Sequence, residues 1–138
     1  MNHHFYMDLL NNPNLLKEIH LVNGIKGDWF QDQLGPQAIV HCSTKIMSHI
    51  GTIKKGDFVH VHVQATGSAS LVHIDVFLEV LMPFASTSRF FFIAHACERI
   101  GDKLWQPPSA KVTSPVYSMV KREIVRIDPN NKQIHTSF

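Results

Sequence analysis

The sequence has little from which a disulfide framework or a membrane span could be built. Only two of its 138 residues are cysteines, Cys42 and Cys97. Each lies in an apolar run typical of a strand, where a small buried thiol is common. We therefore expect reduced cysteines and a cytoplasmic protein. No run of about eighteen apolar residues occurs, and no basic segment followed by a short apolar one opens the sequence, so we expect neither a signal peptide nor a membrane partner.

Neither sign of charge predominates in the sequence. Thirteen Lys and Arg residues against eleven Asp and Glu residues give a net charge of +2, and they are scattered along the chain. This balance argues against a nucleic-acid partner. Hydrophobic residues make up 44% and charged residues 17%, which is ordinary for a globular protein, and the length predicts one domain over residues 1–138.

The common chemical motifs are missing as well. The sequence has no Gly-rich phosphate loop, CxxC pair, GxSxG turn or HExxH stretch. If the protein is an enzyme, we expect it to work without a nucleophile in one of these motifs and without a bound cofactor.

Helical patterns come first along the chain. Residues 2–12 have apolar side chains at Phe5 and Leu9, and Pro13 ends the pattern. Residues 12–22 have Asn12 as a cap and Pro13 at the first helical position. Residues 28–37 are expected to add a further short helix or turn before the chain changes character.

From Ile39 onward the sequence predicts strands. Residues 39–50 are rich in β-branched side chains, residues 58–66 alternate between polar and Val positions, and a turn at Gly67-Ser68 leads into residues 70–82. Residues 88–100 form the next predicted strand. Residues 116–138 predict a closing hairpin with its turn at residues 128–131.

Strict alternation assigns the faces of these strands. In residues 70–82 it puts His73, Asp75, Phe77 and Glu79 on one face and Val72, Ile74, Val76 and Leu78 on the other. Phe90, Phe91 and Phe92 are consecutive and must project to both faces. The simplest architecture is α+β, with N-terminal helices covering the apolar face of an antiparallel sheet.

Two pairs of residues invite a chemical interpretation. His60 and His62 share a strand face and could bind a metal, but no carboxylate follows them, and we expect an exposed polar face with no metal. His4 and Asp8 have helical i, i+4 spacing and could hold or activate water. From spacing alone, an exposed pair in the first helical turn is the simpler interpretation.

The segment from Cys42 to Pro108 resembles the sheet of hotdog-fold proteins of the acyl-CoA thioesterase and dehydratase superfamily. The resemblance is carried by "STKIMSHIGTIKKGDFVHVHVQATGSASLVHIDVFLEV" and "SRFFFIAHACERIGDKLWQPP". More loosely, "HFYMDLLNNPNLLKEIHLV" is similar to the helical region of long-chain fatty acyl-CoA thioesterases. The resemblance implies a long antiparallel sheet wrapped around an N-terminal helix. That family usually has a strand before the helix, and we expect the C-terminal hairpin to replace it.

The resemblance also implies a function and a site. It implies hydrolysis of an acyl thioester, carried by coenzyme A or acyl carrier protein, by activated water at the interface of a homodimer or dimer of dimers. Coenzyme A would be part of the substrate. The residues implied are Asp8 and His4 for catalysis, and Ser48, His49, Lys54 and Lys55 for substrate binding.

Three alternatives stay open. A dehydratase or hydratase of the same fold would use a similar His and acid. A noncatalytic module could hold an acyl chain or small ligand at the same interface. A fold of the nuclear-transport-factor type also follows N-terminal helices with long curved strands, and fold does not settle function in any of these cases.

Overall fold

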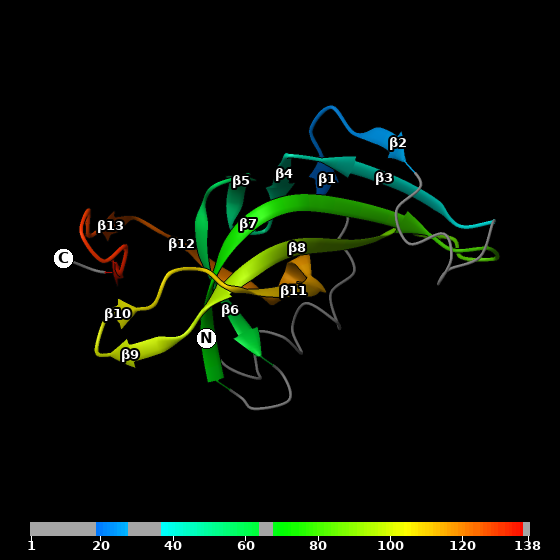
Figure 1. The fold of residues 1–138 in the computed structure, drawn as a ribbon. Helices are drawn as coiled ribbons and strands as arrows, with labels where there is room; N and C mark the ends of the chain where they lie inside the picture. Colours follow the sequence, from blue (N-terminus) through cyan, green and yellow to red (C-terminus); the bar gives the residue numbers. More distant parts are fainter. Residues whose placement is uncertain (1–18, 28–36, 64–67, 137–138) are drawn as a thin grey trace.

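The computed structural model describes residues 19–27, 37–63 and 68–136, and this part of the chain forms three antiparallel sheets (Figure 1). The largest sheet contains β2 (Ile25–Gly27), β3 (Ile39–Ser43), β6 (Phe58–Val63), β7 (Ser68–Leu81), β8 (Arg89–Cys97), β11 (Ala110–Pro115) and β12 (Met119–Glu123). A second contains β1 (His20–Leu21), β4 (Lys45–Ser48) and β5 (Gly51–Lys54). A third contains β9 (Arg99–Gly101), β10 (Leu104–Trp105), β13 (Val125–Ile127) and β14 (Ile134–Thr136).

Strand β7 is the centre of the large sheet. One edge pairs with β8, which in turn pairs with β11. The other edge is divided: β6 pairs with residues 68–73 of β7, and β3 pairs with residues 77–81. Between β3 and β6 the chain leaves the sheet to form the β4–β5 hairpin. The prediction that the long strands are antiparallel is confirmed.

A β-bulge interrupts β7 at Asp75. Ile74 pairs with Ala94 and Val76 pairs with Ile93, so Asp75 is the extra residue. A bulge of one residue reverses the alternation that follows it. Phe77 therefore joins Ile74 in one buried cluster, and Leu78 packs in a different one. The predicted faces of residues 76–79 are wrong for this reason.

The face of the large sheet that carries Val72, Ile74 and Phe77, here called the inner face, is covered by strands. Ile46 of β4 and Ile53 of β5 pack into its core, together with Val116 from the short 3₁₀ helix Val116–Ser118. The described residues contain no α-helix.

The predicted α+β hotdog fold is therefore wrong, because a β-hairpin lies where that fold requires a central helix. The predicted helix at residues 2–12 lies outside the described residues, as does the predicted helix or turn at residues 28–37 except for Gln37. The end of the second predicted helix, His20–Leu21, is strand β1. Residues 39–50 divide into β3 and β4.

The opposite, outer face carries two further apolar clusters. At one end, Phe58 and Leu71 pack with Trp105 and Ile134 of the third sheet. At the other end, Leu78 packs with Val40 and Ile93. The three phenylalanines do project to both faces: Phe92 and Phe90 pack on the inner core and Phe91 on the outer one.

The C-terminal hairpin is present as β13 and β14. The carboxylate of Asp128 accepts hydrogen bonds from the backbone N–H groups of Asn130 and Asn131 and holds its turn. The hairpin pairs with β10 in the third sheet, whereas β12, just before it, pairs with β6 at the margin of the large sheet.

The hairpin cover of the inner face can be tested with Ile53→Ala. Ile53 is 1% exposed, so the substitution should lower the free energy of unfolding by about 2–5 kcal/mol in a urea titration. Ile124→Ala, at a side chain that is 71% exposed, is the matched control and should change it by less than about 0.5 kcal/mol. Equal stability of the two variants would contradict this cover.

Candidate functional site

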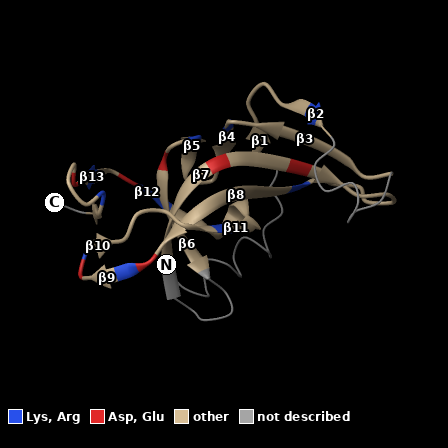
Figure 2. Cartoon of the chain, viewed as in Figure 1, with Lys and Arg blue, Asp and Glu red and all other residues tan. Residues whose placement is uncertain are grey.

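A row of polar side chains crosses the outer face between its two apolar clusters. His73 on β7, His95 on β8 and Lys111 on β11 occupy facing positions on adjacent strands. Residues directly opposite each other in an antiparallel sheet have neighbouring side chains. Asp75 joins this row from the bulge. Figure 2 shows that β7 and β11 each carry charge within a largely uncharged central sheet.

Asp75 and His95 form the closest ionisable pair of the row. His95 Nδ1 lies 2.6 Å from Asp75 Oδ2, and the side chains are 39% and 32% exposed. The imidazole donates its Nδ1–H to the carboxylate. This contact fixes the tautomer, so in the neutral ring Nε2 has the lone pair that can accept a proton. A half-exposed imidazole oriented by a carboxylate has the arrangement of a general base.

The neighbours of this pair add ring packing and positive charge. His73 packs its ring on Phe58, with ring centroids 4.6 Å apart, which ties the row to the apolar cluster beside it. Lys111 is exposed at the other end of the row. An ammonium group beside a general base can attract an anionic substrate or polarise a carbonyl.

The two residues predicted for catalysis, Asp8 and His4, lie outside the described residues. Ser48 and His49 lie at the tip of the β4–β5 hairpin. The Ser48 hydroxyl donates to the Gly51 carbonyl at 2.8 Å and accepts from the Ile50 N–H. His49 Nε2 lies 2.8 Å from the Met119 carbonyl oxygen. These contacts close the hairpin turn and attach it to the start of β12.

Lys54 and Lys55 lie at the other end of the same hairpin. The Lys54 N–H donates to the Asp57 carboxylate at 3.0 Å, the Lys55 N–H donates to the Thr44 carbonyl at 2.7 Å, and both side chains are exposed. Because Lys54 pairs with Lys45 and Ser48 pairs with Gly51, three residues of strand, about 10 Å, separate the two predicted pairs. The structure does not bring these four residues together.

His60 and His62 lie on a face that is more covered than we expected. His60 Nε2 is 3.0 Å from Glu123 Oε1, and Lys121 Nζ reaches the same oxygen at 3.0 Å. Burial lowers the pKa of His60, although the Glu123 carboxylate opposes this shift. His62 is buried. His60 thus links β6 to β12 within the large sheet and packs edge-on against Trp105 of the third sheet. The expected exposed polar face is wrong at these positions.

Sequence reasoning missed the pairing of Asp75 with His95. The pattern put His73 and Asp75 on one face, but the partner strand supplies His95 twenty residues away from Asp75. If the pairing nearest the β7–β8 loop continued without the bulge, Ile74 would lie opposite His95. The only available signal was a His-x-Asp strand followed by a strand with a central histidine.

Comparison with models of known protein families, with curated proteins and with solved structures finds no match to this chain. In the part of the chain that the structure describes, no helix is long and apolar enough to cross a membrane. The function of the protein is therefore inferred from the geometry of the site.

The hairpin contact of His49 predicts a pH dependence of stability. Burial lowers the pKa of His49, and the hydrogen bond to the Met119 carbonyl opposes this shift only in part. The unfolded chain therefore binds a proton more readily than the folded one, so the free energy of unfolding should fall as the pH drops through the usual range of histidine, near 6.5. Urea titrations between about pH 7.5 and 5.5 should show a smaller fall for His49→Gln. His135→Gln, in the C-terminal hairpin, should keep the wild-type fall, and equal slopes in all three proteins would refute the assignment.

The two cysteines should differ in reactivity. Cys97 is 4% exposed beneath Trp105, and burial raises the pKa of its thiol to about 11. Since the thiolate is the reactive form, iodoacetamide at mildly alkaline pH should modify the partly exposed Cys42 first, as followed by mass spectrometry of peptides. Cys42→Ser should remove the fast reaction. Modification of Cys97 at the rate of Cys42 would be inconsistent with its burial.

Proposed function

We propose that the protein hydrolyses an acyl ester or thioester by activating water at the Asp75–His95 pair. The observation that carries the proposal is the 2.6 Å contact between His95 Nδ1 and Asp75 Oδ2 on a half-exposed surface. A base held in this way removes a proton from water without a covalent nucleophile. This agrees with the lack of a nucleophile motif in the sequence.

The proposed reaction has one base and one polarising group. His95 Nε2 takes a proton from water as the water oxygen bonds to the acyl carbon. The carbonyl oxygen gains negative charge, which the Lys111 ammonium on the neighbouring strand stabilises. When the bond to the leaving alcohol or thiol breaks, the proton returns from His95 to that group. Asp75 keeps the imidazole oriented throughout.

The position of the pair supports this role. Asp75 is placed by the bulge, and bulges often re-aim side chains beside active sites. His95 lies on β8, which is paired on both sides by β7 and β11. A side chain on such a strand is held more accurately than one on a loop. Esters and thioesters are the proposed substrates because their carbonyl carbons are reactive enough for attack by water.

The test is a hydrolysis assay on p-nitrophenyl acetate and butyrate and on acetyl, butyryl and octanoyl thioesters of coenzyme A. His95→Gln removes the base and should lower kcat/KM by about a hundredfold or more. Asp75→Asn should also lower kcat, because the amide can no longer hold the same tautomer. Lys111→Gln should lower kcat less, since it leaves the base in place.

Matched controls are available in the third sheet and its connections. Asp102→Asn removes a carboxylate that is 86% exposed, and His135→Gln removes a histidine of β14, and both should keep wild-type rates. Wild-type rates no higher than those of buffer on every compound, or unchanged hydrolysis by His95→Gln, would disprove the proposal.

A further inference from the structure

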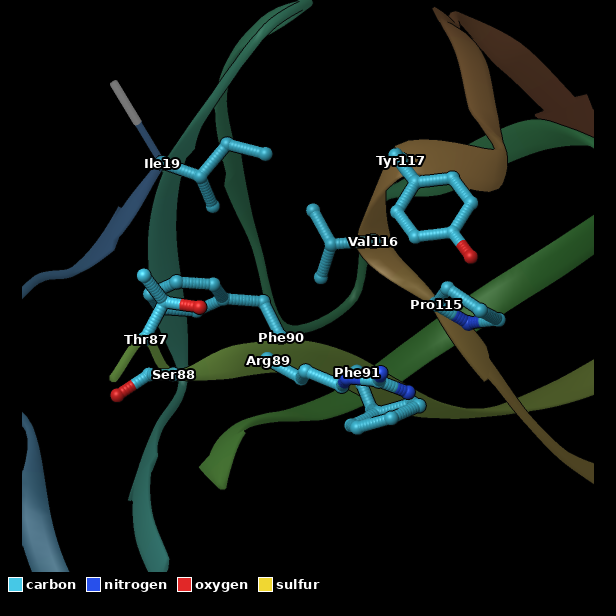
Figure 3. A pocket seen from close by; sticks show the side chains of 9 residues that line it. All are labelled: Ile19, Thr87, Ser88, Arg89, Phe90, Phe91, Pro115, Val116 and Tyr117. Carbon is cyan, nitrogen blue, oxygen red and sulfur yellow. The ribbon is translucent and has the colours of Figure 1, made fainter. Parts of the chain in front are cut away.

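A separate cavity of about 360 Å³ lies where β11 leaves β8. Figure 3 shows the side chains of Ile19, Phe90 and Val116 around the hollow, with Arg89 extending toward Pro115. Ile19 and Val116 are buried and Phe90 is half-buried, so the walls are mainly apolar. A volume of this size is within the range of small-molecule sites.

The ending of β11 explains why the cavity exists. Pairing between β11 and β8 stops at Pro115 opposite Phe91. Proline has no N–H to continue a ladder, and the 3₁₀ helix Val116–Ser118 then turns the chain away from β8. Among the described strands, none pairs with Arg89 and Phe90 on this edge of β8. The fold therefore leaves a strand edge beside an apolar hollow.

The described residues that line the cavity carry positive charge and no negative charge. Among these described residues, Arg89 is the only charged one and none is acidic. Arg89 is exposed and takes part in none of the ion pairs formed among the described residues. A guanidinium group at the margin of an apolar hollow matches a carboxylate joined to an apolar chain.

We infer that this cavity binds a small aliphatic carboxylate, with its chain between Ile19, Phe90 and Val116 and its carboxylate at Arg89. The site is distinct from the Asp75–His95 pair, because Arg89 and His95 are six residues apart on β8, about 20 Å along the strand. Binding here does not depend on the hydrolysis proposed above. The inference adds a ligand site to the protein whether or not that reaction occurs.

The experiment is a titration of the full chain with hexanoate, octanoate and decanoate, followed by calorimetry and by backbone amide chemical shifts. Saturable binding with shifts centred on residues 87–91 and 115–117 is expected. 1-Octanol has the chain without the charge and should bind more weakly than octanoate. Octanoate binding should also weaken as salt rises, since Arg89 is exposed.

Arg89→Gln tests the charge directly and should weaken octanoate binding by about fivefold, which is typical of an exposed ion pair. Arg126→Gln, in β13 of the third sheet, is the matched control and should bind as the wild type does. The octanol affinity should be equal in all three proteins. The inference is overturned if octanoate does not saturate, if shifts fall elsewhere, or if Arg89→Gln binds octanoate as tightly as the wild type.

Discussion

The bulge at Asp75 is the constraint on which the rest of the large sheet depends. Before it, Val72 and Ile74 point to the inner core, and after it Phe77 points there instead of Val76. One extra residue in a long strand thus lets both halves of β7 bury large side chains on the inner face. The same residue supplies the carboxylate that orients His95. Core packing and the candidate site therefore arise from one local irregularity.

The divided edge of β7 explains how, in the part of the chain that the structure describes, strands cover this sheet. Because β3 and β6 pair with different halves of β7, the segment between them is free to leave the sheet. It returns as the β4–β5 hairpin, whose Ile46 and Ile53 fill the inner core. The third sheet covers one end of the outer face through Trp105 and Ile134. Apolar surface on both faces is thus removed from water by strands.

Local pattern predicted the features that depend on neighbouring residues. The antiparallel strands, the closing hairpin and the two-sided phenylalanine run all follow from period-two alternation and turn residues. The bulge could not be predicted, because it depends on the register between β7 and β8, to which both strands contribute.

The covering of the inner face by the β4–β5 hairpin could not be predicted for a similar reason. Ile53 lies between Thr52 and Lys54, and Ile46 lies between Lys45 and Met47. Nothing in these local patterns says which sheet the two isoleucines cover. The site residues taken from the hotdog resemblance lost their basis when that fold proved wrong.

The two proposed sites differ in how the backbone around them is held. His95 lies between paired strands on both sides, so its position relative to Asp75 is fixed by two hydrogen-bond ladders. Arg89 lies where one of those ladders has ended at Pro115. A base must be positioned accurately to transfer a proton, whereas an apolar cavity with a single charge selects ligands only by size and sign. The paired middle of β8 is thus suited to chemistry, and its open end is suited to binding.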